Sequence, residues 1–215
     1  MPRAGLTPAL VTEAGADLVD EIGFDALSMS LLADRLDVKT PSLYKHVAGQ
    51  SDLAHRIGVL AMVEFGDALD RAIQGSGNKS LTAGAHAMRR YVLEHPGRYA
   101  AGNSARPTGP EDPLRPATDR VMAAWAAMMR SYHLEAAQEI HAMRMLRSVL
   151  HGFATLEAAG GFRVDAPVDA SFAWTISFLD HGLQAIASAA GGHRPAPTSS
   201  GREAGGPVGA AGSTA

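Results

Sequence analysis

Apolar residues recur at spacings of three and four along most of the chain, which is the pattern of helices with one buried face. No segment alternates between apolar and polar residues for long enough to indicate a strand. We therefore predict an all-α protein of about nine helices. The expected helices include residues 8–22, 29–36, 40–46, 52–73, 81–94, 117–130, 135–158 and 169–189.

Residues that cap helices mark several of these expected starts. Thr7 and Thr40 each precede a proline, and Ser28 and Ser51 each stand before a new apolar run. A serine or threonine hydroxyl accepts a hydrogen bond from a free amide of the first turn, and proline is tolerated at the first helical position. These four residues are therefore predicted N-caps.

Breaks in the pattern divide the chain into an N-terminal three-helix domain, a connecting helix, a larger helical domain and a tail. The predicted bounds are residues 1–50, 51–74, 75–190 and 191–215. The third part opens with a short glycine-rich linker. Four prolines between Tyr99 and Pro116 predict a loop there. The tail has almost no large apolar side chain, so we expect it to be disordered.

The second and third short helices, with the tight turn between them, form a helix-turn-helix pattern over residues 29–47. Small Ala33 stands where two steeply angled helices must approach each other, and Val38 fills the angle between them. The third helix then presents an edge formed by residues 39–42. Such an edge fits the major groove of DNA, where hydroxyls and backbone amides meet bases and phosphates.

The charge of the whole chain gives no indication of nucleic-acid binding, because the net charge is −3. A local patch would have to supply the attraction to DNA. Lys39, Tyr44, Lys45 and His46 crowd into one short stretch of an otherwise acidic chain. This surface content favours DNA binding over a three-helix unit that binds nothing.

The run from Thr40 to Val47 resembles the recognition helix of the TetR family of repressors. Residues 23–24, 27–29 and 51–53 also match that family, so the resemblance covers roughly residues 7–60. A second resemblance lies downstream. Residues 147–162, together with His95-Pro96-Gly97, look like the C-terminal regulatory domain of the TetR subgroup named for a Trp-His-Gly signature.

This resemblance implies a ligand-responsive repressor that binds a palindromic operator as a homodimer and is released by a small-molecule inducer. The implied DNA contacts are Ser28, Ser30, Lys39, Thr40, Pro41, Ser42, Tyr44, Lys45 and His46. Three departures from the family pattern affect this expectation. Asp37 replaces a glycine of the turn, Gln50 stands near a common lysine, and Ser30 replaces a longer basic residue.

Bulky aromatic and methionine side chains in the second half are candidates for lining a ligand cavity. The candidates are Met88, Tyr91, Trp125, Met128, Phe153 and Trp174. At helical spacing, these residues equally suit an ordinary hydrophobic core. The pattern alone leaves both interpretations open.

The last helix carries two apolar stripes, although a surface helix needs only one. One stripe is Phe172, Ile176, Leu179, Leu183 and Ile186, and the other is Trp174, Phe178, His181 and Ala185. We expect one face to pack on the domain and the other on a second copy, giving a four-helix bundle with residues 135–158. The expected interface residues are Leu150, Ile176, Leu179, Leu183 and Ile186.

Several other functions find no support in the sequence. The chain has no cysteine, and its histidines lack the i,i+4 pairing of a zinc-binding helix. No nucleophile elbow, paired catalytic carboxylates or phosphate loop is present. We therefore expect no catalysis, metal or cofactor, and without a signal peptide or membrane-length apolar run we expect a cytoplasmic protein. The alternative function is a helical small-molecule-binding or scaffold protein that does not bind DNA.

Overall fold

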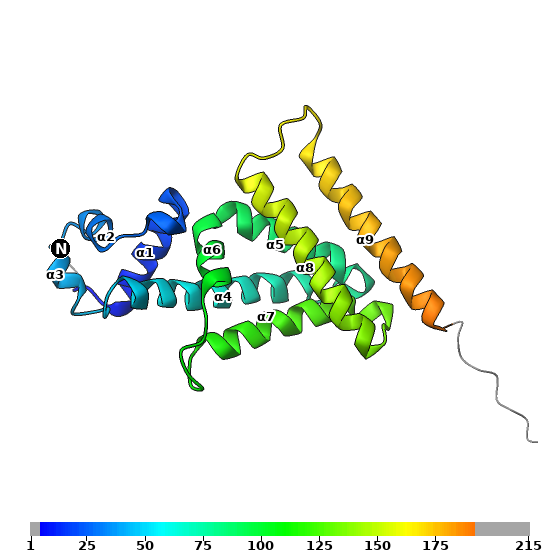
Figure 1. Cartoon of the computed structure of the whole chain (residues 1–215), viewed down its shortest axis with the longest axis horizontal. Coiled ribbons are helices and arrows are strands. Elements are labelled where there is room, and N and C mark those ends of the chain that lie inside the picture. The colour runs from blue at the N-terminus through cyan, green and yellow to red at the C-terminus, as the bar shows by residue number, and fades with distance from the viewer. Residues whose placement is uncertain (1–4, 192–215) are drawn as a thin grey trace, which may run out of the picture.

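The computed structural model describes residues 5–191, which are helical and contain no strand (Figure 1). Its α-helices are α1 (Pro8–Ile22), α2 (Met29–Arg35), α3 (Thr40–Leu43), α4 (Gln50–Ile73), α5 (Ser80–Glu94), α6 (Pro96–Ser104), α7 (Leu114–Met129), α8 (Ala136–Ala158) and α9 (Val168–Gly191). Short 3₁₀ turns lie at Phe24–Ala26, Gly77–Lys79 and Arg130–Tyr132. The all-α prediction is confirmed. Apart from Gly191, the expected tail lies outside the described residues.

The first three helices pack with the start of α4 around a small aliphatic core. Its buried residues are Val11, Ala16, Leu18, Val19, Leu27, Met29, Leu32, Ala33, Leu43, Val47, Leu53, Ile57 and Ala101. Two predicted caps are confirmed, because Thr7 Oγ1 accepts from the amide of Leu10 and Ser28 Oγ from that of Leu31, each at 3.2 Å. Two others are wrong: α4 begins after Gly49, and the N-cap of α3 is Lys39.

Helix α4 connects the two halves of the molecule and runs through both of them (Figure 1). Its first turns bury Leu53 and Ile57 in the N-terminal core. Its later turns bury Phe65 and Leu69 in a second and larger core, which α5, α7, α8 and α9 also form. A displacement along α4 therefore affects both cores.

The predicted loop from Tyr99 to Pro116 is wrong over its first part, which forms α6. Pro96 ends α5 and also starts α6, because proline suits the first position of a helix. A Cβ on Gly97 would lie 2.0 Å from the carbonyl oxygen of Val19 in α1. Glycine is therefore the residue that permits this close contact between α6 and α1.

The true loop covers residues 105–113, and Asp112 holds it in shape. The Asp112 carboxylate accepts hydrogen bonds from the Thr108 amide at 2.6 Å, the Thr108 hydroxyl at 2.7 Å and the Leu114 amide at 2.8 Å. These bonds, together with one to His55, hold the pKa of Asp112 well below its usual range. The loop is thus a fixed wall beside α6 and α7.

Helices α8 and α9 form the outer side of the C-terminal half (Figure 1). Helix α9 packs inward through Phe172, Ile176, Leu179 and Leu183, and its other apolar stripe faces outward. Among the described helices, none is long and apolar enough to cross a membrane.

Candidate functional site

Helices α2 and α3 meet at a tight turn, as the helix-turn-helix pattern predicts. Asp37 adopts a left-handed backbone conformation with φ 52°, which aspartate tolerates better than most residues. The Val38 amide donates to the carbonyl of Ala33 at 3.0 Å and closes the turn. Asp37 therefore takes the place that the family pattern gives to glycine.

The predicted DNA-contacting residues gather around α3. Lys39, Pro41, Tyr44 and Lys45 are exposed, as is Ser30 on α2. Ser28, Thr40, Ser42 and His46 are partly buried. Helix α3 ends at Leu43, so residues 44–46 lie in the turn that follows it, whereas the sequence pattern extended the helix through His46.

The orientation of α2 is fixed from α1 by an ion pair. Arg35 donates to both carboxylate oxygens of Glu21, at 2.7 and 2.8 Å. This bidentate geometry sets direction as well as distance. The edge that α2 and α3 present is consequently tied to α1.

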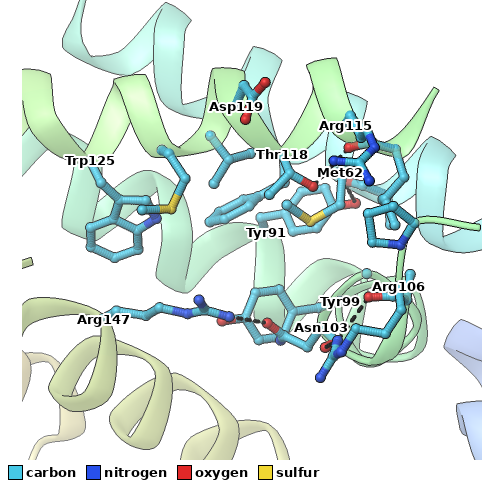
Figure 2. A pocket seen from close by; sticks show the side chains of 18 residues that line it. Met62, Tyr91, Tyr99, Asn103, Arg106, Arg115, Thr118, Asp119, Trp125 and Arg147 are labelled. Carbon is cyan, nitrogen blue, oxygen red and sulfur yellow. Dashed lines mark hydrogen bonds between the residues drawn. The ribbon is translucent and has the colours of Figure 1, made fainter. Parts of the chain in front are cut away.

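The C-terminal half encloses a cavity of about 400 Å³ between α4, α6 and α7, which α5 and α8 complete (Figure 2). Its buried wall is aromatic, with Phe65, Tyr91, Tyr99 and Trp125. Its exposed rim carries polar groups, with arginines at positions 106, 115 and 147. The cavity is large enough for a small organic molecule.

Two of the six predicted ligand residues, Tyr91 and Trp125, line this cavity. Met88 and Met128 belong to the solid core, where Met128 closes against Gly84.

The other two predicted ligand residues also lie away from the cavity. Phe153 packs on Phe162 and Phe172, with ring centroids 4.8 and 4.9 Å away. Trp174 is 68% exposed on α9. The structure therefore does not gather the six predicted residues into one site.

Several cavity residues escaped the sequence analysis for identifiable reasons. Tyr99 and Asn103 lie in α6, whose start is signalled by Pro96, but the sequence pattern predicted a loop there. Arg106 does lie in the loop that follows α6, where nothing in the sequence marked it as a cavity residue. Phe65 and Met62 fit the apolar stripes of α4 and gave no separate signal. Aromatic residues on a helix reveal that they are buried, but not whether they pack solidly or border a cavity.

The predicted dimer residues mostly lie inside the protomer. Leu150, Ile176, Leu179 and Leu183 are at most 5% exposed, and they belong to the C-terminal core. These four are not available to a second copy, whereas Ile186 is 42% exposed. Both stripes of α9 fit the helical period. The one that packs inward carries Phe172, Ile176, Leu179 and Leu183 and belongs to the C-terminal core, whereas the other carries Trp174 and Phe178.

The outward stripe of α9 is aromatic. Trp174 and Phe178 are 68% and 65% exposed, and their rings stack with centroids 5.5 Å apart. On α8, Ile140 and Leu156 are each 54% exposed. Large apolar side chains on a free surface commonly mark an interaction site.

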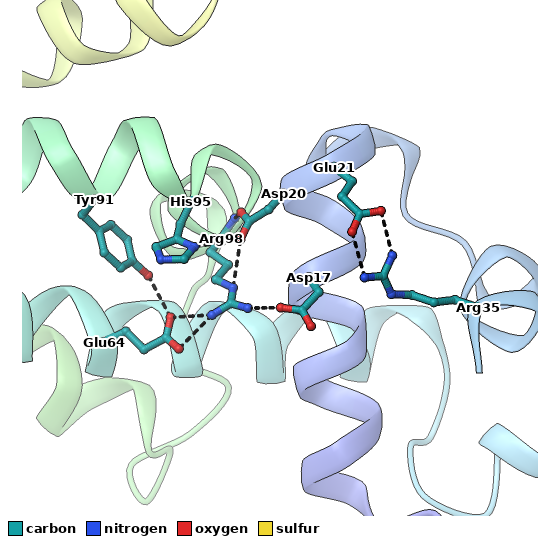
Figure 3. A network of polar contacts seen from close by, with 8 residues as sticks. All are labelled: Asp17, Asp20, Glu21, Arg35, Glu64, Tyr91, His95 and Arg98. Atoms are coloured by element: carbon teal, nitrogen blue, oxygen red, sulfur yellow. Dashed lines mark hydrogen bonds and ion pairs between the residues drawn. The ribbon is translucent and has the colours of Figure 1, made fainter.

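A chain of polar contacts connects the cavity wall to α1 (Figure 3). The Tyr91 hydroxyl donates to Glu64 at 3.2 Å and to the carbonyl of Ala61 at 3.1 Å. Glu64 accepts from Arg98 at 2.9 Å, and Arg98 also pairs with Asp17 of α1. The contacts therefore pass from α5 through α4 and α6 to α1.

Arg98 is the centre of this network, and its side chain is only 9% exposed. Its backbone amide donates to Asp20 at 2.8 Å, and its Nε lies 3.0 Å from the other Asp20 oxygen. That second contact has the distance of an ion pair but an angle too poor for a hydrogen bond. Although burial opposes the charge, the ion pairs to Glu64, Asp20 and Asp17 raise the pKa of Arg98, so it remains a cation.

Tyr91 enters the same network as a hydrogen-bond donor. Burial raises the pKa of its phenol well above the usual range, and the charge of Glu64 raises it further. The phenol is therefore protonated throughout the physiological range. Because Tyr91 lines the cavity and also holds Glu64, an occupant that moves its ring also moves the partner of Arg98.

The described residues offer no metal centre. No group of three or more histidines, aspartates and glutamates stands close enough together to hold an ion within residues 5–191. The cavity is lined by three arginines, an amide, hydroxyls and a single carboxylate, Asp119, a set that suits an organic ligand better than a cation.

Comparison with known proteins identifies the class of this chain as helix-turn-helix transcriptional regulators. A family model described as bacterial regulatory proteins of the tetR family matches residues 11–57, and one described as a tetracyclin repressor-like C-terminal domain matches residues 81–179. The chain belongs to the TetR family. Both parts of the resemblance to this family are thereby confirmed.

Named relatives agree with this assignment. The chain is 33% identical to the uncharacterized HTH-type transcriptional regulator Rv0681 of Mycobacterium tuberculosis, over 84% of this chain and 83% of the relative. It is 27% identical to YobS of Bacillus subtilis, over 85% and 95% of the two chains. A TetR variant from Acinetobacter baumannii, solved in complex with minocycline, has the same fold with a TM-score of 0.59, at 19% identity over 89% of this chain and all of that one.

Proposed function

We propose that this protein is a transcriptional repressor that binds operator DNA as a homodimer and releases it when a small molecule enters the cavity. The observation that carries the proposal is the contact chain from Tyr91 through Glu64 and Arg98 to Asp17. It connects a cavity large enough for a ligand to the first helix of the helix-turn-helix unit. An effector site and a DNA-reading surface need such a physical connection to influence each other.

The DNA-reading part of the proposal rests on the edge around α3. Lys39 and Lys45 are exposed there and form no ion pair with a carboxylate in the described part of the chain. Thr40 and Ser42 stand at the start of the helix, where hydroxyls can reach base edges. Lysines in such positions add affinity for any sequence, and the helix edge adds specificity.

The homodimer is proposed on the outward stripe of α9, with α8 beside it. Burying Trp174 and Phe178 against a symmetry mate removes large aromatic surfaces from water. Two-fold symmetry would then repeat the α3 edge, and repeated edges about 34–36 Å apart match successive major grooves. A ligand that shifts α6 and α1 would change this separation and favour release.

DNA binding is tested by fluorescence anisotropy with a duplex from the region upstream of the gene and a scrambled duplex of equal composition. The upstream duplex is expected to bind about 10³-fold more tightly or better, with affinity falling steeply as salt rises. Equal, weak binding to both duplexes would overturn the proposal. It would favour instead a helical small-molecule-binding protein.

Ligand response is tested on the same complex by adding candidate small molecules and following release of the duplex. Tyr91→Phe keeps the ring in the cavity but removes the hydroxyl that holds Glu64, so it should reduce release. Tyr132→Phe is the matched control, because its hydroxyl donates to Asp180 and does not line the cavity. Equal release from both variants would contradict the proposed route.

A further inference from the structure

The rim of the cavity has a charge that the rest of the cavity does not balance. Arg106 follows α6, Arg115 lies in α7 and Arg147 lies in α8, and all three line the same space (Figure 2). Asp119 is the one carboxylate among the residues that line it. The lining therefore carries an excess of positive charge in a chain whose net charge is −3.

Neutral oxygens hold all three arginines in place. Arg106 donates through Nη1 to the carbonyls of residues 103, 104 and 105 at 2.8–3.3 Å. Arg115 donates through Nε to the carbonyl of Gly109 at 2.8 Å, and Arg147 through Nη2 to the side-chain oxygen of Asn103 at 3.3 Å. A guanidinium has five N–H donors, so each arginine keeps further donors for a ligand.

Five arginines elsewhere in the described part of the fold pair with carboxylates, at positions 35, 56, 89, 98 and 120. Arg89 pairs with Glu157 and Asp169, and Arg120 pairs with Asp67 and Asp70. Over residues 5–191, no ion pair joins a carboxylate to Arg106, Arg115 or Arg147. The cavity thus brings together three positioned cations that no carboxylate of the described residues neutralises. A negatively charged ligand could do so.

The interior of the same cavity requires a different chemistry. Phe65, Tyr91, Tyr99 and Trp125 are each at most 7% exposed and present ring surfaces to the space. The Tyr91 hydroxyl is already engaged by Glu64 and the Ala61 carbonyl. An occupant of this part gains from burying an apolar, preferably aromatic, body.

We propose that the cavity takes an organic anion, with an aromatic or aliphatic body against the tyrosines and Trp125 and an acidic group at the arginine rim. A carboxylate or sulfonate matches the planar donor fork of arginine, and charge-assisted hydrogen bonds are the stronger kind. This inference rests on the proposed function only in treating the cavity as the effector site. It specifies the class of effector, which the regulatory function by itself does not.

A pair of fluorescent probes isolates the charge. 1-Anilinonaphthalene-8-sulfonate carries an acidic group on an aromatic body, and N-phenyl-1-naphthylamine has the same body without it. Titration of each probe into the full-length protein gives two dissociation constants. The ratio of these constants measures how much the protein prefers the anion, and about a tenfold preference or more is expected.

Arginine variants then locate that preference. Arg106→Gln, Arg115→Gln and Arg147→Gln are each expected to reduce anion binding about three- to tenfold, since exposed charges are screened by solvent, and the triple variant should abolish the preference. Arg147→Lys keeps the charge and should retain most of the binding. Arg144→Gln is the matched control, because Arg144 is exposed on α8 and does not line the cavity. Binding of the neutral probe should change less than about twofold in all of them.

The outcomes separate this inference from the proposed function. A preference that survives in the triple variant, or that falls equally in Arg144→Gln, would place the anion elsewhere and overturn the inference. Equal affinity for the two probes would also overturn it. In each of those cases the anisotropy assay with operator DNA still decides the regulatory function. If operator binding fails while the anion preference depends on the three arginines, the inference stands and the regulatory proposal falls.

Discussion

The two hydrophobic cores of this protein are filled with different side chains. The buried residues of the N-terminal core are aliphatic, from Val11 to Ala101. The buried part of the C-terminal core includes Phe65, Tyr91, Tyr99, Trp125, Tyr132 and Phe172. The cavity between α4, α6 and α7 borders four of these rings, those of Phe65, Tyr91, Tyr99 and Trp125.

The two halves also differ in where they carry their candidate functional groups. The N-terminal half carries its proposed DNA-reading residues on the outside, at the edge of α3. The C-terminal half has its chemistry inside, in a cavity with an aromatic wall. Arg98 lies at the boundary and connects the inner site to the outer one.

The largest expected effect concerns the outward aromatic stripe of α9, which is a candidate interaction surface on the outside of the C-terminal half. The double change Trp174→Ser with Phe178→Ser should weaken the proposed homodimer by 100-fold or more, because central aromatic contacts of an interface are each worth about 2–4 kcal/mol. Sedimentation velocity across a concentration series measures the dissociation. Operator binding should fall with it.

A matched control separates loss of the dimer from loss of the fold. Leu93→Ser changes another apolar residue, 40% exposed on α5, and should leave the mass unchanged. The double variant should remain helical by circular dichroism, because both rings are exposed. An unchanged dissociation constant of the dimer in the double variant would show that Trp174 and Phe178 do not form the dimer interface.

The next largest effect concerns the ion pairs of Arg98, which connect the two halves of the molecule. Arg98→Gln leaves Asp20 and Glu64 without their cation in a partly buried site, which should lower the free energy of unfolding by about 3–5 kcal/mol. Asp17→Asn removes a partner that is 53% exposed and should cost less than about 1 kcal/mol. Urea titrations of both variants test the difference. Equal small losses would mean that the halves are not joined through Arg98.

The sequence pattern located the edge around α3 more closely than the lining of the cavity, for a physical reason. The residues from Lys39 to His46 are consecutive in the chain, and Lys39, Tyr44 and Lys45 among them are polar and exposed, so a local sequence pattern can reveal them. The cavity is lined by residues from helices α4 to α8. Whether such a residue lines the cavity or lies in the core depends on how the helices pack. Tyr91 and Met88 are both bulky, buried residues of α5, and their spacing in the sequence suits a core and a cavity wall equally. Only Tyr91 borders the cavity.

Two further predictions were wrong because the same local sequence pattern is compatible with two structures. Pro96 ends one helix and starts another, and the sequence pattern predicted only the first of these two roles. The two stripes of α9 are equivalent by periodicity, and the neighbours of α9 decide which one packs inward. Asp37 shows the opposite case, because its left-handed turn maintains the expected geometry without the family's glycine.

The outer site makes a smaller and more specific prediction. Lys45→Ala should weaken binding to every DNA sequence by about tenfold or less and reduce the slope of log affinity against log salt by about 0.9, because one phosphate contact is lost. Lys79→Ala is the control, since Lys79 lies in the turn before α5. Anisotropy titrations at several salt concentrations provide the slopes. Unchanged affinity and slope would remove Lys45 from the DNA-reading edge.

The smallest expected effect concerns pH and the contact between α6 and α8 beside the cavity. Nδ1 of His151 lies 3.0 Å from the Tyr99 hydroxyl. Burial lowers the pKa of His151 below its ordinary value, and the charge of Arg147 lowers it further. The folded protein therefore favours the neutral imidazole more than the unfolded chain does. The stability that follows is fully present above about pH 6.5, the usual histidine pKa, and is lost as pH falls from there to the folded-state pKa.

Two variants separate the hydrogen bond from the pH dependence. Tyr99→Phe should lower the unfolding free energy by about 0.5–1.5 kcal/mol at neutral pH but keep the pH dependence, because burial remains the main cause of the pKa shift. His151→Gln should lose both the hydrogen bond and the dependence. Urea titrations from pH 7.5 down through the weakly acidic range measure the two slopes. If the unfolding free energy of His151→Gln still falls as the pH is lowered, another group causes the acid sensitivity. The contact between His151 and Tyr99 would then not be the source of the pH dependence.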